Sequence, residues 1–90
     1  MKISYGPAKR DITLRDRGLD FDDARIVITG LNVTQEDKRF DYPERRFITY
    51  GMLNDRLIMF AWAPTDNGIR VISMRTCNDR EYGKFAAGMG

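Results

Sequence analysis

Three strand-like segments joined by two tight turns fill the second half of this 90-residue sequence. Apolar and polar residues alternate with a period of about two over Arg45–Met52 and Ile69–Thr76. Between them, Leu57–Ala63 is almost continuously apolar, which favours a central strand buried on both faces. The connections are Leu53–Asp55 and Asn67–Gly68, and the Asn-Gly pair predicts a hairpin turn of type I′. Because such turns reverse the chain, the three segments predict an antiparallel meander.

The residues before the meander carry two helix signals. Pro7 suits the first helical position, and Gly18 suits a left-handed C-terminal cap, so a first helix is predicted from Pro7 to about Arg17. Asp20 is a good N-cap for a second helix that Gly30 would end. The apolar residues of this second helix recur at helical spacing: Phe21, Ala24, Val27 and Ile28.

Shorter elements are predicted at both ends of the chain and at its centre. Lys2–Tyr5 reads as a short strand and Val33–Gln35 as a weak one, with a charged connection over residues 36–44. Asn78 and Glu81 match a capping box that would start a short last helix, and Ala86–Gly90 is predicted to fray. The order β-α-α-β-β-β-β-α predicts one α+β domain over residues 1–90.

The sequence contains no His and a single Cys, which excludes several kinds of catalytic site. A Ser-His-Asp triad, a Cys-His dyad and His-based acid–base catalysis all require an imidazole. A structural zinc site requires four Cys or His ligands. The acidic cluster Asp20, Asp22 and Asp23 is explained by helix capping rather than by metal binding. We therefore predict no metal and no cofactor, so that any catalysis depends on Arg, Lys, Tyr and carboxylates.

The hydrophobic segments favour a cytoplasmic protein without membrane contact. The longest apolar run, Leu57–Ala63, is far shorter than the ~20 residues that span a bilayer. The first five residues read as a strand and not as the hydrophobic region of a signal peptide.

The net charge is only +2, but the charges are unevenly distributed. Residues 1–18 carry five basic and two acidic groups, and residues 67–90 carry four and two. Residues 19–66 carry six basic and nine acidic groups. The two basic segments could meet and form one positive face, whereas the alternative is a mixed, solvated surface.

The two turns also predict the strand register. With pivots at residue 54 and at residues 67–68, Arg46 lies opposite Trp62, and Trp62 lies opposite Ser73. Because side chains alternate between the faces of a sheet, Arg46, Trp62, Ser73 and Arg75 would share one face. The rest of that face would be core: Ile48, Tyr50, Ile58, Phe60, Ile69 and Val71.

Such a group of residues suits RNA chemistry. Arginine binds phosphate through two parallel hydrogen bonds, and Trp can stack on an unpaired base. Attack of a 2′-hydroxyl on the neighbouring phosphate needs positioning and compensation of the growing negative charge, and arginines supply both. Proton transfer without His is not fixed by any spacing, and the candidates are Glu44, Glu81, Tyr50, Tyr82 or an Arg.

A purely structural interpretation competes with this one. Arg46 and Arg75 would then pair with Glu44 and Glu81, and Trp62 would be packing. Lys9 and Arg17 on the first helix are, taken alone, more typical of solvated side chains than of a site.

Four segments, in order, resemble the BrnT toxins of type II toxin–antitoxin systems. Tyr5-Gly6-Pro7-Ala8-Lys9 followed by residues 14–24 resembles the opening of these toxins, Trp-Asp-Pro-x-Lys and then Lys-His-Gly-Val-x-Phe-Glu-x-Ala. Glu44-Arg45-Arg46-Phe47 with Gly51 is similar to the family's Glu-x-Arg strand that leads to Gly. Residues 69–75, followed by Glu81 and Tyr82, are similar to Arg-Ile-Ile-Ser-Ala-Arg followed by Glu and an aromatic residue.

The resemblance implies a RelE-like fold and a metal-independent endoribonuclease that cuts RNA and stops translation. It also implies a partner, a BrnA-like antitoxin with a ribbon-helix-helix domain, in a complex of two toxins with two antitoxins. Such a complex would bind operator DNA only through the antitoxin.

The matching positions imply the site residues. Those expected to be catalytic are Arg17, Arg46, Arg75 and Glu81, and those expected to bind RNA are Lys9, Arg70, Ser73 and Trp62. The family's Lys-His pair is Asp16-Arg17 here, so that Arg17 could replace only the charge-stabilising part of the His. The alternative is therefore a catalytically inactive member of the family that binds the antitoxin as a co-repressor subunit.

Overall fold

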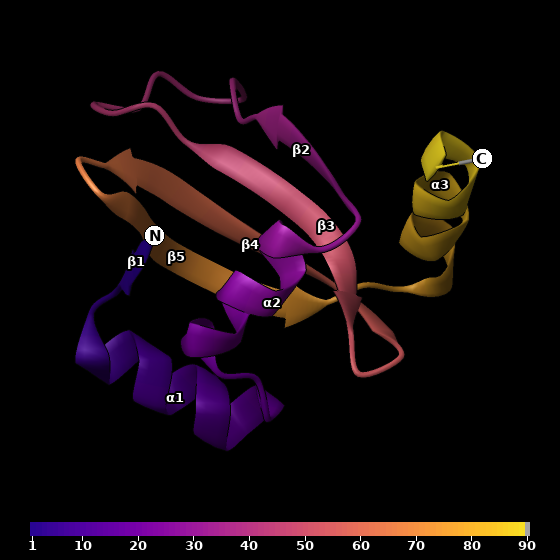
Figure 1. Cartoon of the computed structure of the whole chain (residues 1–90), viewed down its shortest axis with the longest axis horizontal. Helices are drawn as coiled ribbons and strands as arrows, with labels where there is room; N and C mark the ends of the chain where they lie inside the picture. The colour runs from indigo at the N-terminus through magenta and orange to yellow at the C-terminus, as the bar shows by residue number, and fades with distance from the viewer. Residues whose placement is uncertain (90) are drawn as a thin grey trace.

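The computed structural model describes residues 1–89 and shows an α+β fold built on one five-stranded sheet (Figure 1). The strand order is β1-β5-β4-β3-β2; β1 pairs with β5 in parallel, and every other pair is antiparallel. This confirms the predicted fold class. The elements in chain order are β1 (Lys2–Ser4), α1 (Pro7–Arg17), the 3₁₀ turn η1 (Phe21–Asp23), α2 (Ala24–Thr29), β2 (Asn32–Glu36), β3 (Phe47–Leu53), β4 (Arg56–Thr65), β5 (Gly68–Thr76) and α3 (Asp79–Met89).

The ends of the first two helical segments follow from their capping residues. Gly6 precedes Pro7 at the start of α1, and Gly18 ends the helix with φ of 67° while its N–H donates to the carbonyl of Leu14. The Asp20 carboxylate accepts a hydrogen bond from the N–H of Asp22, as predicted for an N-cap. The predicted second helix is divided, because η1 comes first and the α-helix proper begins only at Ala24.

The hydrophobic core lies between one face of the sheet and the segment η1–α2. Phe21 and Ala24 are fully buried against Phe60 and Ile58 of β4, and Met74 of β5 closes the same cluster. A Cβ at position 51 would lie 2.6 Å from Cγ1 of Val27. Glycine at this position of β3 therefore allows α2 to approach the sheet closely.

The predicted strand register is wrong, by one residue between β3 and β4 and by one to two residues between β4 and β5. Phe47, and not Arg46, lies opposite Trp62, and a bulge between Ala61 and Trp62 shifts the pairing of β4 with β5. Ser73 therefore lies opposite Ala61, and Val71 lies opposite Trp62. The bulge depends on contacts between distant strands, which the turn residues do not specify.

The predicted type I′ turn at Asn67–Gly68 is also wrong. Thr65 pairs with Gly68, so Gly68 is already the first residue of β5. A Cβ on Gly68 would overlap the backbone of Lys2 in β1, and this close approach accounts for the glycine. Apart from Gly18, the described residues with positive φ are Asn54 and Asp55, at 51° and 65°, which is the type I′ geometry in the β3–β4 hairpin.

Helix α3 lies beside β2 and β3, apart from α1 and α2 (Figure 1). The capping box predicted at its start is present, because Asn78 and Glu81 exchange side chain–backbone hydrogen bonds of 2.9 and 3.0 Å. The predicted fraying is wrong for residues 86–89, which are helical, and Gly90 lies outside the described residues. None of the helices within residues 1–89 is long and apolar enough to cross a membrane.

Candidate functional site on the arginine face

The sheet face opposite η1 and α2 carries a regular arrangement of arginines and small residues. Strand pairing and side-chain alternation place three rows across it: Ala63 with Arg70, Ala61 with Ser73, and Tyr50 with Met59 and Arg75. Arg46 directly precedes β3 and continues its alternation, so that it adjoins the first row. We call this surface the arginine face and define it by Arg46, Tyr50, Ala61, Ala63, Arg70, Ser73 and Arg75.

The bulge brings Arg70 to this face. Regular alternation from Ser73 and Arg75 would place Arg70 on the opposite face, but the register shift in β5 reverses the phase. Arg70 and Arg75 are therefore separated by the length of β4 from Ala63 to Met59, roughly 13 Å at the rise of an extended strand. The small side chains of Ala61 and Ser73 lie between the two arginines and leave the surface between them low.

Arg75 is held by Glu81 at the start of α3. The guanidinium donates to both carboxylate oxygens, with Nη1–Oε1 at 2.9 Å and Nη2–Oε2 at 2.8 Å. This pairing, together with the N–H of Asn78, lowers the pKa of Glu81 to about 2. The pKa of Arg75 is raised by the same hydrogen bonds. Glu81 is consequently ionised at neutral pH and orients Arg75.

Arg70 and Arg46 share a carboxylate at the other end of the face. Arg70 pairs with Glu44, and Nε of Arg46 lies 3.9 Å from the same Glu44 oxygen. The Arg46 guanidinium also lies over the ring of Tyr42, 4.2 Å from its centroid. Nε of Arg46 is buried and has no hydrogen-bond partner among residues 1–89.

The loop between β2 and β3 positions Tyr42 beneath Arg46. Asp37 is the buried centre of this loop and accepts hydrogen bonds from Nε of Arg39 at 2.8 Å and from the Tyr42 hydroxyl at 3.0 Å. These donors hold the pKa of Asp37 well below its usual range, chiefly through Arg39. The loop is thus folded around an ionised carboxylate.

The two basic residues of α1 that were expected to act at the site bind the edge of β5. Strand β1 covers this edge only along Gly68–Arg70. Beyond it, Lys9 Nζ donates to the carbonyl of Ile72 at 2.8 Å, and Arg17 Nη1 donates to that of Met74 at 2.7 Å. Both cations therefore lie next to the strand segment that carries Ser73 and Arg75.

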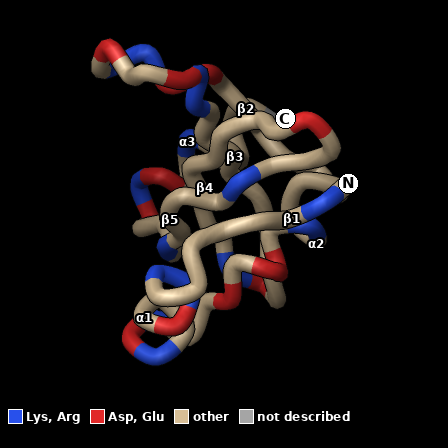
Figure 2. The backbone as a smooth tube through the Cα atoms, turned by 90° about the vertical axis from the view of Figure 1, so that its left-hand side faces the viewer, with Lys and Arg blue, Asp and Glu red and all other residues tan. Residues whose placement is uncertain are grey.

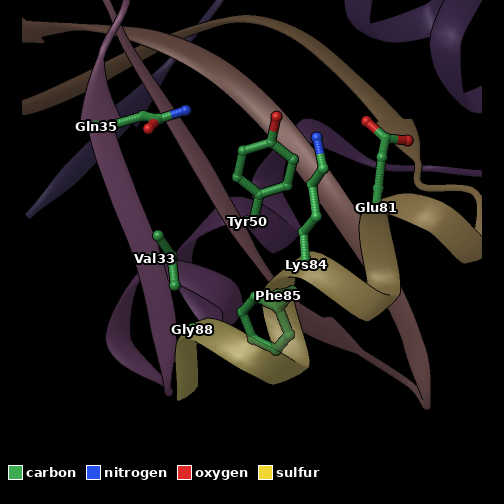
Figure 3. Close-up of a pocket in the computed structure, with 7 residues that line it drawn as sticks. All are labelled: Val33, Gln35, Tyr50, Glu81, Lys84, Phe85 and Gly88. Atoms are coloured by element: carbon green, nitrogen blue, oxygen red, sulfur yellow. The ribbon is translucent and has the colours of Figure 1, made fainter. Parts of the chain in front are cut away.

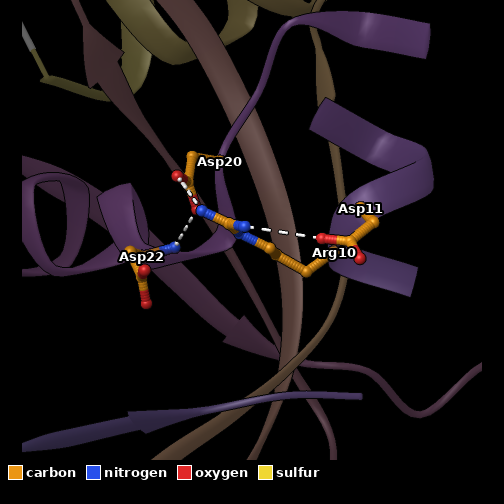
Figure 4. A network of polar contacts seen from close by, with 4 residues as sticks. All are labelled: Arg10, Asp11, Asp20 and Asp22. Carbon is orange, nitrogen blue, oxygen red and sulfur yellow. Dashed lines mark hydrogen bonds and ion pairs between the residues drawn. The ribbon is translucent and has the colours of Figure 1, made fainter. Parts of the chain in front are cut away.

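The position of α1 along this edge is set by an ion pair with the turn that follows it (Figure 4). Arg10 donates to both oxygens of Asp20, with Nη2–Oδ2 at 2.8 Å and Nε–Oδ1 at 3.1 Å, and Asp20 also caps η1. Asp11 accepts a longer hydrogen bond from Arg10. Lys9 and Arg17 are thereby carried on a helix that is fixed to the core.

The structure separates Trp62 from the predicted group. Its row contains Phe47 and Val71, on the face that packs against η1 and α2. The indole stacks on Phe47 with 4.8 Å between ring centroids, and its N–H donates to Oγ1 of Thr49 at 2.9 Å. The same alternation moves Ile58, Phe60, Ile69 and Val71 to the core face and leaves Ile48 and Tyr50 on the arginine face.

The distribution of charged residues agrees only in part with each of the two arrangements expected from the sequence, one positive face or a mixed, solvated surface. Figure 2 shows acidic and basic residues interspersed along α1 and along the loop that leaves β2, with few charges on the strands. The basic groups that gather at β5 are Lys9, Arg17, Arg70 and Arg75. Within the described part of the chain, no group of three or more Cys, His, Asp or Glu residues could hold a metal ion.

A pocket of about 340 Å³ adjoins the arginine face between α3 and the strands β2 and β3 (Figure 3). Its lining is Val33, Gln35, Tyr50, Glu81, Lys84, Phe85 and Gly88. Gln35, Lys84 and Phe85 were not among the site residues predicted from the sequence. A usable signal was present, because Glu81, Lys84, Phe85 and Gly88 recur at helical spacing and so share one face of α3.

The comparisons with known proteins agree with the sequence resemblance. A family model described as "Ribonuclease toxin, BrnT, of type II toxin-antitoxin system" matches residues 5–81, which include every residue of the arginine face. No curated protein sequence matches the chain significantly.

Proposed function

Because the chain belongs to the BrnT family of ribonuclease toxins of type II toxin–antitoxin systems, we propose that it cleaves RNA on the arginine face. The observation that carries this proposal is the arrangement along β5, where Arg70 and Arg75 flank a low surface of small residues. Lys9 and Arg17 add two positive charges along the adjacent strand edge. Such a surface attracts a phosphate backbone and leaves room for an extended single strand.

The proposed reaction is internal transfer of the RNA phosphate. The 2′-oxygen forms a bond to phosphorus and releases its proton to solvent, while the bond to the 5′-oxygen breaks and that oxygen takes a proton from solvent. The products are a 2′,3′-cyclic phosphate and a 5′-hydroxyl. Arg75 would bind the phosphate oxygens whose negative charge grows in the transition state.

Glu81 has a positioning role in this proposal. Its carboxylate is engaged by Arg75 and by Asn78, and its pKa of about 2 makes it a weak proton acceptor at neutral pH. The ion pair instead orients the guanidinium before RNA binds. The chain supplies positioning and charge compensation, for which it needs neither an imidazole nor a metal.

A type II toxin has an antitoxin partner, and we propose the finer features of that pairing from the family. The partner would be a BrnA-like protein with a ribbon-helix-helix domain, in a complex of two toxins and two antitoxins. This complex would contact operator DNA only through the antitoxin. The free toxin would stop translation in the cytoplasm by cutting RNA.

A second candidate function follows from the ion pairs themselves. Arg70 and Arg75 are both already paired with carboxylates, Glu44 and Glu81, and Asp16-Arg17 replaces the family's Lys-His pair. A chain with this arrangement could serve as a catalytically inactive co-repressor subunit that binds the antitoxin. Its arginines would then stabilise the fold.

The experiment that separates the two functions is cleavage of end-labelled RNA in EDTA, with and without ribosomes. The nuclease should leave 2′,3′-cyclic phosphates, and Arg75→Ala should lower the rate by about 10²- to 10³-fold, the usual effect of removing one charge-stabilising donor. Arg56→Ala is the matched control, because Arg56 is exposed at the start of β4, away from the arginine face. Intact RNA in both settings, from a folded protein that binds its antitoxin, would overturn the nuclease and favour the co-repressor function instead.

A further inference from the structure

The pocket beside the arginine face has an apolar floor and a polar mouth. Figure 3 shows the ring of Phe85 and the side chain of Val33 at the floor of the pocket, with the polar ends of Tyr50, Lys84 and Glu81 pointing to one side. Glu81 is satisfied by Arg75. Within residues 1–89, by contrast, the Gln35 amide, the Tyr50 hydroxyl and the Lys84 ammonium make no side-chain hydrogen bond or ion pair.

We propose that this pocket binds one unpaired base of the RNA substrate and selects adenine. Phe85 and Tyr50 would contact the faces of the base, Gln35 its hydrogen-bonding edge, and Lys84 an adjacent phosphate. This inference rests on the proposed function, because it assigns a substrate contact next to Arg75.

The size and composition of the pocket favour a single base as its occupant. Pockets for small molecules span roughly 300–1,000 Å³, and one of about 340 Å³ lies at the lower end of that range. Aromatic side chains that stack on splayed bases, with polar groups that read the base edge, are the usual means of recognising single-stranded RNA. The pocket supplies both, because its floor is aromatic and its mouth carries two polar groups without a partner among the described residues, Gln35 and Tyr50.

The neighbourhood of the pocket favours a base that belongs to the bound RNA strand. Glu81 lines the pocket and also holds Arg75, so the proposed phosphate site and the pocket share a wall. Lys84 lies one turn further along α3 and offers a second positive charge at the mouth. A nucleotide with its phosphate near Arg75 and Lys84 can therefore place its base in the pocket.

Gln35 is the reason for choosing adenine. A glutamine side chain can present an amide N–H and its carbonyl oxygen side by side, and its usual nucleic-acid partner is adenine, which offers a donor at N6 beside the acceptor N7. Gln35 is exposed on the edge strand β2, and its side chain makes no hydrogen bond to any residue that the structure describes, so its amide is free to make this pair.

The test uses 2′-O-methyl RNA hexamers, which cannot be cleaved, with four sequences that differ at one central base. We expect the adenine hexamer to bind the wild type about 5- to 150-fold more tightly than the others, the range that one bidentate base contact provides. Gln35→Leu should abolish this preference and leave the weaker, base-independent affinity. Lys84→Ala should weaken all four complexes, whereas Arg80→Ala, which removes an equal charge from α3 outside the pocket, should not.

Equal affinity of the wild type for all four hexamers, or a preference that Gln35→Leu leaves intact, would overturn the proposal. Arg75-dependent cleavage without base preference would reject the pocket assignment and keep the nuclease. Base preference without cleavage would keep the pocket assignment and reject the nuclease. Amide NMR shifts at Val33, Gln35 and Phe85 that appear with an antitoxin peptide, but with none of the hexamers, would assign the pocket to the protein partner and also overturn the proposal.

Discussion

Arg75 of β5 and Glu81 of α3 form a two-pronged ion pair that joins the sheet to the last helix, with N–O distances of 2.9 and 2.8 Å. Helix α3 is otherwise weakly packed, because most of its described side chains are exposed. The pair therefore has two effects. It orients the guanidinium on the arginine face, and it fixes the helix that forms one wall of the neighbouring pocket.

Glu81→Gln should destabilise the protein in a pH-dependent way. The folded state lowers the pKa of Glu81 from 4.5 to about 2, so the stabilisation is complete above about pH 4.5 and is lost as the pH falls towards 2. We expect Glu81→Gln to cost about 1 kcal/mol or less at pH 7, because Arg75 is partly exposed and solvent screens the pair. Gln retains the capping box, so α3 should still form.

Urea unfolding at pH 7 and at pH 3 measures this difference. The gap in unfolding free energy between wild type and Glu81→Gln should narrow at the lower pH. Other carboxylates with lowered pKa values, such as Asp20 and Asp37, titrate in both proteins and cancel in the comparison. A gap that stays constant with pH would show that the ion pair does not stabilise the folded state.

Arg70→Ala should reduce the salt dependence of RNA binding. Each phosphate contact with single-stranded nucleic acid contributes about 0.7 to the slope of log affinity against log salt concentration. If Arg70 exchanges Glu44 for a phosphate when RNA binds, its removal should lower the slope by about that amount. Fluorescence anisotropy across a salt series provides the slope, and Arg56→Ala should leave it unchanged. An unaltered slope in Arg70→Ala would place the RNA elsewhere.

Trp62→Phe should reduce stability without changing RNA affinity. The substitution removes the hydrogen bond to Thr49 and part of the stacking on Phe47, which should cost about 1–2 kcal/mol. Thr49 keeps its hydrogen bond with the hydroxyl of Thr34, so the buried Thr49 hydroxyl is not left without a partner. Urea unfolding and RNA titration of the same samples test both statements. A loss of affinity in a variant of normal stability would return Trp62 to the RNA site.

The parts of the fold that were predictable from the sequence depend on local contacts. Pro7, Gly18 and Asp20 set helix ends through their own backbone preferences and through bonds to residues at most four positions away. The capping box at Asn78 is equally local. The division of the second helix into η1 and α2 could not be predicted, because both conformations satisfy the same apolar spacing.

The composition of the candidate site depends on contacts between distant residues. One bulge opposite Ala61 and Trp62 decides that Arg70 joins Ser73 and Arg75 on one face. Side-chain alternation alone cannot predict that shift, and it led to the wrong prediction that Trp62 lies among the arginines. The pocket combines β2, β3 and α3, so its members become neighbours only when the chain has folded.

Gly68→Ala should destabilise the protein, because a Cβ at this position would overlap the backbone of Lys2. Both strands would have to separate, at a cost of about 1–3 kcal/mol or more. Gly83→Ala is the matched control in α3, where a Cβ would have open space among the described residues and alanine favours a helix by about 0.5–1 kcal/mol. Urea unfolding should therefore give changes of opposite sign.

Because β1 covers β5 next to the carbonyls that Lys9 and Arg17 bind, Gly68→Ala should also weaken the attachment of α1. Hydrogen exchange of the amides of α1 should then accelerate, and unchanged exchange would show that α1 is held by the Arg10–Asp20 pair and the core without help from β1.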